Sequence, residues 1–459
     1  MKNFHRYTIG WIKSAVESLA FLPLPIMLGG ILLGCGLFYV ELNTDVSTYI
    51  KESVPAIVVS SQDTARTILG IMIGGLITLT VFTFTQMMSL FSQVAASYSP
   101  RLLPYLTGSS SLQFVMGTYL AVIVTSTIVL VSIRGSDKAS VPVLSVTICI
   151  ALSIMCLMLF LYFVTTISNK IQADKIIESV YKNGVEAIKN SCQAKNFEEK
   201  KLPDDLEDWH TIPSPIGGFI GTINYNMLSG LAKEYNTCFY IGAARGQYLP
   251  KNSPLLQSER RIDPDQIKKV LAVVSPNHRK YNDWHLPNIR LLTEIAVKSM
   301  SPGINDPGSA IDVLDRLSAL LARVMALPGY NYFRAEGGGE VYFSRYSFGD
   351  VLTGVMQELR QYCKADVLVM RRLFKMLNHL DFATGDHPDY RHLIREEIMA
   401  LVEDARKNIH NSKDRRVIAR EIITGRRKTE KLFENTNFLL NDDFLLERGT
   451  WDNDLFSDQ

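Results

Sequence analysis

Four long apolar stretches constrain the fold of this chain more than any other feature of its sequence. They cover about residues 19–40, 68–91, 114–133 and 141–167. Each reaches the roughly 20 residues that a helix needs to cross the hydrocarbon core of a bilayer. The first follows basic residues, as in a signal peptide, but it is too long and lacks a clear cleavage site. The sequence therefore predicts four membrane-spanning helices, and the first of them stays as an anchor.

Charged residues divide the chain into two parts. Residues 1–167 hold roughly 14 charged side chains and residues 168–459 roughly 80, so the first part is solvated by lipid and the second by water. The cores of the last three stretches contain no charged residue or histidine, which argues against a proton-coupled transporter. A net charge of +2 gives no reason to expect a nucleic acid as partner. The six cysteines form no CxxC and predict neither a disulfide framework nor a zinc site.

Basic residues beside the predicted spans indicate the topology. Eight lie on the side of the two termini, and four lie on the opposite side. Cytoplasmic loops carry the excess of lysine and arginine, so both termini are expected in the cytoplasm. The two sets are Lys2, Arg6, Lys13, Arg101, Lys170, Lys175, Lys182 and Lys189, and Lys51, Arg66, Arg134 and Lys138.

The second span carries a polar stripe and a pair of glycines. Four hydroxyl side chains recur at steps of three, four or seven and therefore share one helical face: Thr78, Thr85, Ser89 and Ser92. Gly70 and Gly74 form a GxxxG pair, as do Gly30 and Gly34 in the first span, and such pairs let a neighbouring helix approach closely. The stripe indicates candidate pore-lining residues. The alternative is an interior helix whose hydroxyls only bond to neighbouring helices.

The remainder of the chain predicts a cytosolic α+β region. We expect an amphipathic coupling helix and linker, then a small β-rich module containing a short helix at residues 224–234, then a helical domain and a mobile acidic tail. The predicted divisions are residues 1–167, 168–211, 212–282, 283–440 and 441–459. Within the helical domain, the predicted helices are residues 287–300, 307–325, 349–380, 391–410 and 412–435, and the glycines at 337–339 mark a loop.

Residues 246–255 look like the strand–turn–strand of biotinyl/lipoyl-type barrel-sandwich modules. This resemblance implies a hairpin and a small barrel-sandwich-like module. Lys251 is not flanked by methionines, so no carrier-lysine role is implied.

The most distinctive phrase is SPGINDP at residues 301–307. A helix is expected to end near its start, and a Pro–Gly turn would lead to a capping aspartate and a proline at the first position of the next helix. The amides at that helix start could hold an anion. The alternative is a structural corner whose polar groups only satisfy the backbone. The loop residues are Ser301, Pro302, Gly303, Asn305, Asp306 and Pro307.

SPGINDP, the earlier SYSPRLL and the four predicted spans resemble a bacterial family of predicted membrane proteins, domain of unknown function twenty-two fifty-four. The resemblance covers nearly the whole chain. It implies an inner-membrane location, four spans and a cytosolic C-terminal region, and it implies no established activity. Gly308 and Ser309 stand where members usually have a bulky residue after the second proline.

Other polar groups form weaker patterns. Three histidines and three aspartates lie between two predicted helices, but their spacing fits no metal site. They are His379, His387, His392, Asp381, Asp386 and Asp389. His278, Asp283 and His285 could form an acid/base set, but no nucleophile motif accompanies them. The arginine pairs 371–372 and 415–416 predict solvated or ion-paired faces. We expect no catalysis, metal or cofactor.

These patterns favour one function and leave a second open. The favoured hypothesis is a homo-oligomeric, channel-like pore with a cytosolic regulatory domain. Its partners would be the lipid bilayer, further copies of the chain, and a small ion or anionic ligand. Four spans rarely enclose a path, so several subunits would each contribute one helix. The alternative is a membrane-anchored ligand sensor or scaffold without transport activity.

Overall fold

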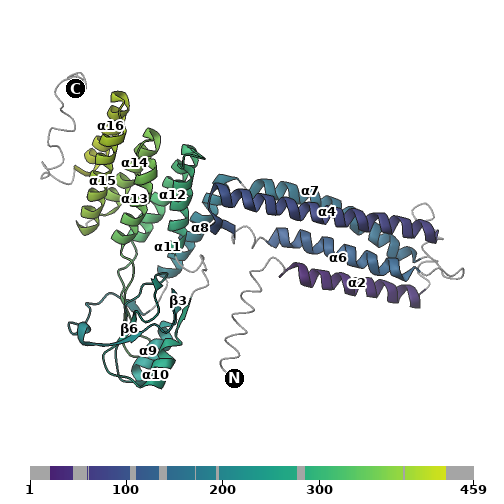
Figure 1. Ribbon diagram of the computed structural model, residues 1–459, viewed down its shortest axis with the longest axis horizontal. Coiled ribbons are helices and arrows are strands. Elements are labelled where there is room, and N and C mark those ends of the chain that lie inside the picture. Colours follow the sequence, from purple (N-terminus) through teal and green to yellow (C-terminus); the bar gives the residue numbers. More distant parts are fainter. Residues whose placement is uncertain are drawn as a thin grey trace. The chain divides into compact units, whose positions relative to one another are not determined.

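In the computed structural model the chain folds into two compact units, residues 1–179 and 180–459 (Figure 1). The second is called the C-terminal unit. The structure describes residues 21–44, 59, 61–103, 110–133, 142–170, 172–192, 196–276, 285–385 and 388–430. The predicted acidic tail, residues 441–459, lies outside the described residues.

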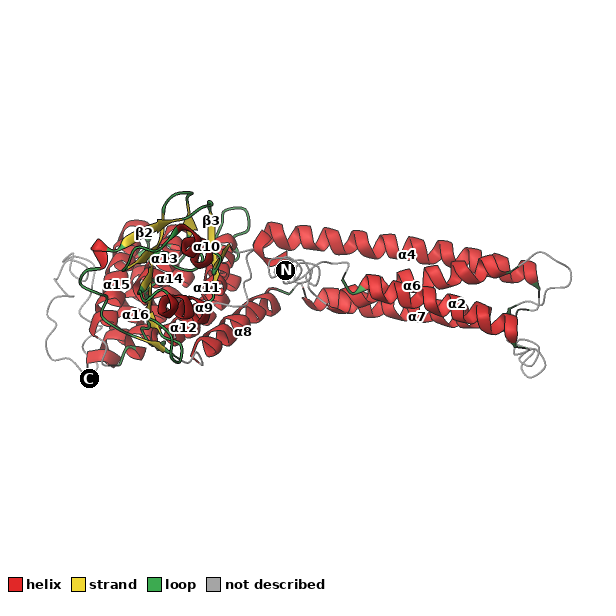
Figure 2. Ribbon diagram, turned by 90° about the horizontal axis from the view of Figure 1, so that it is seen from below, coloured by secondary structure: helices red, strands yellow, loops and turns green. Residues whose placement is uncertain are grey.

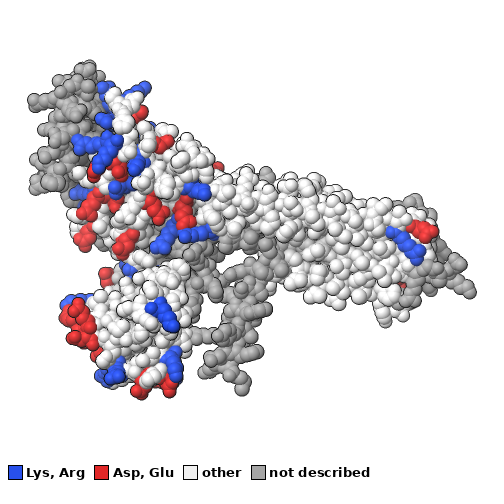
Figure 3. All heavy atoms as spheres, in the orientation of Figure 1, with Lys and Arg blue, Asp and Glu red and all other residues white. Residues whose placement is uncertain are grey.

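The first unit contains a bundle of four long helices. They are α2 (Pro23–Asn43), α4 (Gln62–Ser97), α6 (Ser110–Ser132) and α7 (Val143–Lys170). All four are long and apolar enough to cross a membrane, as the sequence predicts. Figures 1 and 2 show them running side by side, and the face drawn in Figure 3 is almost free of charged side chains except at one end.

Helix α2 packs on α6 through small residues. A Cβ added to Gly30 would lie 2.6 Å from the Ala121 carbonyl oxygen, and one added to Gly34 would lie 2.9 Å from Ile128 Cδ1. The Thr125 hydroxyl donates to the Gly30 carbonyl at 2.8 Å. Only glycine allows two backbones to come this close.

Polar contacts tie the helix ends of the bundle together. The Glu41 carboxylate, at the end of α2, accepts bonds from the backbone and hydroxyl of Ser145 in α7 at 3.1 and 3.2 Å. Arg66, near the start of α4, donates to the Ile133 carbonyl after α6 at 3.0 Å. These charged residues lie at the ends of the helices, where water can reach them.

Helix α8 (Ala173–Cys192) follows α7 as a separate helix. The amphipathic coupling helix predicted at the start of residues 168–211 is α8, which begins at Ala173, whereas α7 runs to Lys170. Within the C-terminal unit, a Cβ added to Gly184 of α8 would lie 3.0 Å from Leu320 Cδ2. The Tyr330 hydroxyl donates to the Ser191 carbonyl at 2.9 Å. The second half of α8 is therefore built into the C-terminal unit.

Two β-sheets form the first part of the C-terminal unit. The larger has the strand order β1-β8-β9-β4-β6-β2, and the smaller has the order β5-β3-β7. All pairs are antiparallel except β4 with β9. The bounds are β1 (Phe197–Glu198), β2 (His210–Pro213), β3 (Gly218–Ile223), β4 (Phe239–Ile241), β5 (Tyr248–Leu249), β6 (Pro254–Ser258), β7 (Val274–Pro276), β8 (Tyr332–Phe333) and β9 (Val341–Phe343).

The expected hairpin at residues 246–255 does not form. β5 pairs with β3, whereas β6 pairs with β2 and β4, so the two strands belong to different sheets. The larger sheet also extends beyond the predicted β-rich segment. Two of its strands, β8 and β9, come from residues 283–440, which the sequence predicted as helical. Strand pairing between distant segments is set by packing, which local sequence patterns do not reveal.

Helices α9 (Tyr225–Glu234) and α10 (Pro264–Leu271) accompany the sheets. The short helix predicted at residues 224–234 is α9, and Asn224 caps it by accepting a bond from the Met227 amide at 3.1 Å. The glycine loop at 337–339 lies against α9: a Cβ on Gly339 would be 2.6 Å from the Lys233 nitrogen, and the Ser229 hydroxyl donates to the Gly339 carbonyl at 2.6 Å. The loop is glycine-rich because a helix backbone fills the space beside it.

The described part of the chain from residue 285 onward contains six helices, with β8 and β9 between the second and the third. The helices are α11 (His285–Ser299), α12 (Pro307–Met325), α13 (Phe348–Cys363), α14 (Val367–Ala383), α15 (Pro388–Asn408) and α16 (Ser412–Glu430). The single helix predicted for residues 349–380 is two helices, because Asp366 interrupts it and caps α14 through the Val369 amide at 2.9 Å.

Candidate functional site

The polar stripe of α4 faces away from the bundle. Thr78, Thr85, Ser89 and Ser92 are all exposed. The buried residues of α4, among them Leu76 and Met87, lie about half a turn away on the opposite side of the helix. The candidate pore-lining residues therefore share one outer face of a single chain, and the inner face of α4 is apolar apart from Thr83.

A groove of about 500 Å³ borders this stripe between α4 and α7. Its two hydroxyl groups are satisfied within their own helices: Thr78 donates to Gly74 at 2.9 Å and Ser153 to Cys149 at 2.8 Å. The groove therefore requires no polar occupant. Its lining consists of Met72, Gly75, Leu76, Thr78, Leu79, Phe82, Ser153, Ile154 and Leu157.

The two predicted glycine pairs lie in different surroundings. Gly30 and Gly34 are in close contact with α6, whereas Cβ atoms added to Gly70 and Gly74 would meet nothing within 4 Å. Gly75, beside them, is equally open. Among the residues that the structure describes, nothing packs against the glycine face of α4.

The SPGINDP loop forms an exposed corner between α11 and α12. The Ser301 hydroxyl donates to the Lys298 carbonyl at 2.6 Å, and the Asp306 amide donates to the Ser299 carbonyl at 2.8 Å. Asn305 has a φ of 47°, a left-handed conformation that asparagine tolerates better than most residues. Pro302 and Gly303 are exposed at the turn, and Pro307 opens α12.

Asp306 occupies the position that an anion would take at the start of α12. Its carboxylate accepts a hydrogen bond from the Ser309 amide at 3.1 Å. Hydrogen bonds from Ser309 and from the Gly308 backbone lower the pKa of Asp306, so the side chain stays ionised. The helix amides are thus satisfied from within the chain, which favours the structural interpretation of this corner.

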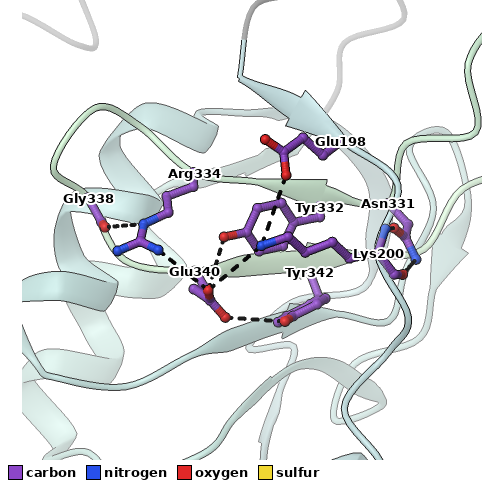
Figure 4. Close-up of polar contacts among 8 residues, drawn as sticks. All are labelled: Glu198, Lys200, Asn331, Tyr332, Arg334, Gly338, Glu340 and Tyr342. Carbon is purple, nitrogen blue, oxygen red and sulfur yellow. Dashed lines mark hydrogen bonds and ion pairs between the residues drawn. The ribbon is translucent and has the colours of Figure 1, made fainter.

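The C-terminal unit contains a polar cluster that the sequence did not reveal (Figure 4). Glu340 accepts bonds from the hydroxyls of Tyr332 at 3.1 Å and Tyr342 at 3.2 Å. Lys200 Nζ lies 3.6 Å from the centre of the Tyr332 ring and 4.0 Å from Glu340 Oε1. Arg334 lies 3.6 Å from the same carboxylate oxygen. One carboxylate therefore holds two phenols and two cations.

The cluster fixes the segment that follows α8. Asn331 holds the Lys200 backbone at both ends, accepting from its amide at 2.9 Å and donating to its carbonyl at 2.8 Å. The Phe197 ring lies 4.7 Å from the Phe333 ring and 5.3 Å from the Tyr330 ring. Aromatic residues are typical of strands, so the aromatic runs in β8 and β9 could have predicted these two strands from the sequence.

The histidine and aspartate set between α14 and α15 does not converge. His379 Nδ1 lies 2.7 Å from the Ser318 hydroxyl, whereas buried Asp381 lies 3.8 Å from Arg391 Nε. Burial raises the pKa of Asp381 against the opposing effect of the neighbouring arginines. His392 is near Glu396 at 3.6 Å, and Asp389 lies in the first turn of α15. Asp386 and His387 lie outside the described residues, and within the described ranges no three metal-ligating side chains come together.

Of the predicted acid/base set, only His285 is described. Burial, together with the nearby charges of Arg345 and Arg245, lowers its pKa to about 4. His285 is therefore neutral at physiological pH. His278 and Asp283 lie outside the described residues.

The arginine pair in α14 is ion-paired, as predicted. Arg372 contacts the Asp315 carboxylate, and Arg371 bonds to Glu421 at 2.8 Å. These contacts join α12, α14 and α16.

A model of the family described as "Predicted membrane protein (DUF2254)" matches residues 16–379. The chain belongs to this family. Family membership and the four apolar helices make it a predicted membrane protein of an uncharacterised family. The match spans the bundle, both sheets and the SPGINDP corner.

Three curated relatives are also uncharacterised. A Mycobacterium bovis protein (Mb1321c) and a Mycobacterium tuberculosis protein (Rv1290c) are each 22% identical over 292 residues, which is 61% of this chain and 56% of the relative. A third, from Mycobacterium tuberculosis (MT1328), is 21% identical over the same length. The chain thus spans about half the length of these relatives. No solved structure matches the chain.

Proposed function

We propose that the chain is a homo-oligomeric inner-membrane pore in which α4 of each copy lines the path and the C-terminal unit regulates it. The observation that carries the proposal is the outward hydroxyl stripe of α4, flanked by the open glycines Gly70 and Gly74. Hydroxyls gain nothing from hydrocarbon, whereas they can solvate a small ion or water. Four on one exposed face favour a watery surrounding.

The path requires several copies because the inside of one bundle is packed. The inward face of α4 presents Leu69, Leu76, Met87 and Phe91, which are all buried. A closed ring around a symmetry axis would bring the stripes of neighbouring copies together. The open glycines would let the helices approach one another there.

The proposal includes the topology indicated by the basic residues. Both termini are cytoplasmic, which places the C-terminal unit in the cytoplasm. Reporter fusions after Gln459 and in the loop around residue 50 should report opposite sides of the membrane. A periplasmic C-terminus would contradict this topology. No catalytic step and no cofactor are part of the proposed function.

Cysteine labelling tests the stripe. Cysteines at Thr78, Thr85, Ser89 and Ser92 should react with a membrane-impermeant thiol reagent above the background of the parent protein. Ile77 and Phe84 are matched controls, because both are exposed on the single chain but lie about a quarter-turn or more from the stripe. Their cysteines should face lipid or a neighbouring helix and react less. Equal protection at all six positions would contradict a pore.

The alternative is a membrane-anchored sensor or scaffold, and the C-terminal unit gives it some support. That unit has its own apolar core, and its Lys200–Glu340 cluster is partly exposed. A native mass measurement showing only monomers, together with no ion flux in proteoliposomes, would reject the pore and favour this alternative.

A further inference from the structure

The smaller sheet of the C-terminal unit presents apolar side chains on its outer face. Phe219 in β3 and Tyr248 in β5 are 37% and 56% exposed, and their rings lie 5.3 Å apart. Ile216, just before β3, is 52% exposed. These three large apolar side chains lie together on a face of the sheet that is exposed to solvent.

Alternation along the two strands shows that this face is separate from the core. Ile220 and Leu249 are buried, whereas their neighbours Phe219 and Tyr248 point the other way. An antiparallel sheet with one wet face normally carries polar side chains there. The aromatic pair instead stands opposite across the β3–β5 register.

Lys251 adds a positive charge to the same place. It is exposed, and a Cβ added to Gly217 would lie 3.4 Å from both the Lys251 backbone nitrogen and the Tyr248 hydroxyl, so Lys251 follows β5 beside the aromatic pair. Residues 210–223 and 235–258, which include β3 and β5 of the smaller sheet, contain no aspartate or glutamate. Among the residues that the structure describes, Lys251 has no carboxylate in ion-pair contact.

We propose that Ile216, Phe219, Tyr248 and Lys251 form a docking surface for the anionic lipid surface of the membrane that holds the chain's own helices. Aromatic side chains favour the interface between headgroups and acyl chains, and a lysine without neighbouring carboxylates is attracted to anionic headgroups. Because the four spans tether the C-terminal unit to the bilayer, docking is intramolecular in character and a weak contact suffices. The proposal does not depend on the pore.

The size of the surface favours lipid over a protein partner. A stable protein interface uses about 20–30 residues on each side. Three apolar side chains and one lysine fall far short of that, yet they suffice for a reversible membrane contact when the rest of the chain is already anchored.

Hydrogen–deuterium exchange of the full chain tests the proposal. The protein is placed at one copy per nanodisc, in discs of phosphatidylcholine alone or with one-third phosphatidylglycerol, and in detergent. Peptides covering residues 214–222 and 246–253 should exchange more slowly in the discs with phosphatidylglycerol. Peptides from α14 should exchange equally in all three. Equal exchange of the sheet peptides in all conditions would overturn the proposal.

Surface variants make the test specific. Lys251→Gln should reduce the phosphatidylglycerol-dependent protection by about fivefold, the contribution of one basic residue at an anionic surface. Ile216→Ser combined with Tyr248→Ser should abolish the protection in the discs with phosphatidylglycerol. Phe382→Ser is the matched control, because Phe382 is an exposed aromatic residue on α14, and it should change nothing in the sheet. Exchange is also compared between discs that hold one copy and discs that hold several. Protection that depends on the number of copies and not on the lipid would overturn the proposal and assign the surface to a second copy.

Discussion

In the four-span bundle, α2 and α6 meet backbone to backbone, and Gly30 leaves no room for a methyl group against Ala121. In the C-terminal unit, helices meet through buried side chains such as Leu314 and Leu373 and through pairs such as Arg360 with Asp404. Lipid gives no hydrophobic gain when two apolar helices associate, so close packing provides the attraction. In water, burial of apolar side chains provides it. Substitutions that add volume should therefore affect the bundle most, and substitutions that alter charge should affect the C-terminal unit most.

The largest effect is expected from adding volume to the α2–α6 contact. Gly30→Ile places four carbons where even a Cβ would lie 2.6 Å from a backbone oxygen. We expect α2 to separate from α6 and the bundle to lose at least about 3 kcal/mol, at the upper end for overpacking. Thermal unfolding in detergent, monitored by size-exclusion chromatography, measures this loss of stability.

Gly29 provides the control for this substitution. It is the preceding residue in α2, and nothing lies within 4 Å of an added Cβ. Gly29→Ile should leave the melting temperature close to that of the parent. Equal melting temperatures for the two variants would show that glycine contacts do not hold the bundle together, and the comparison would fail.

The next effect concerns pH and the C-terminal unit. His285 has a pKa of about 4 in the folded chain, against 6.5 for an ordinary histidine. The unfolded chain therefore binds this proton more tightly, so stability is lost as the pH falls from about 6.5 to about 4, by about 3 kcal/mol in full. Pulse proteolysis of the full chain at several pH values measures it.

His285→Gln isolates this contribution. The variant should keep its stability between pH 6.5 and pH 4 better than the parent does. Asp381 and Glu397 act in the opposite direction, because burial raises the pKa of both carboxyls, and they remain in both proteins. The same steep acid dependence in the variant would assign it to another group.

A medium effect is expected from breaking a partly buried ion pair. Arg360 lies 3.4 Å from Glu397 and 2.7 Å from Asp404, and it joins α13 to α15. Arg360→Met leaves both carboxylates without this cation and should cost about 2 kcal/mol. Restoring neutrality with Glu397→Gln in the same chain should recover part of that loss, as urea unfolding can measure.

Lys407 and Glu403 supply the matched exposed pair. Lys407 Nζ lies 2.5 Å from Glu403 Oε1 on one face of α15, and both side chains are largely exposed to water. Lys407→Met should leave stability unchanged, because solvent screens exposed pairs. A comparable loss in both variants would mean that helix propensity, and not the buried pair, sets the effect.

The elements predicted correctly from the sequence depend on local patterns. Continuous apolar runs gave the four spans, because a bilayer requires about 20 such residues in a row. Asp306 identified the start of α12, because a cap bonds to an amide only three residues away. The interruption at Asp366 carried the same kind of signal and was missed within a long apolar pattern.

The elements that could not be predicted depend on distant partners. β8 pairs with β1, so that Lys200 meets Tyr332 and Glu340, more than 130 residues along the chain. Nothing local specifies that meeting. The two GxxxG pairs make the same point. Their spacing shows that a helix can approach, but only the fold shows that Gly30 packs against α6 and that no described residue packs against Gly74.

The smallest effect is expected at the SPGINDP corner, where one cap holds the start of a helix. Asp306→Ala removes the bond to the Ser309 amide and should cost about 1 kcal/mol. The loss stays small because the Asp306 amide still donates to the Ser299 carbonyl at 2.8 Å, a backbone contact that the substitution leaves in place. Asp306→Asn keeps a capping oxygen and should lose less, which urea unfolding of both variants can establish. If Asp306→Ala instead keeps full stability and changes the binding of inorganic phosphate, the aspartate acts at an anion site and is not a simple cap.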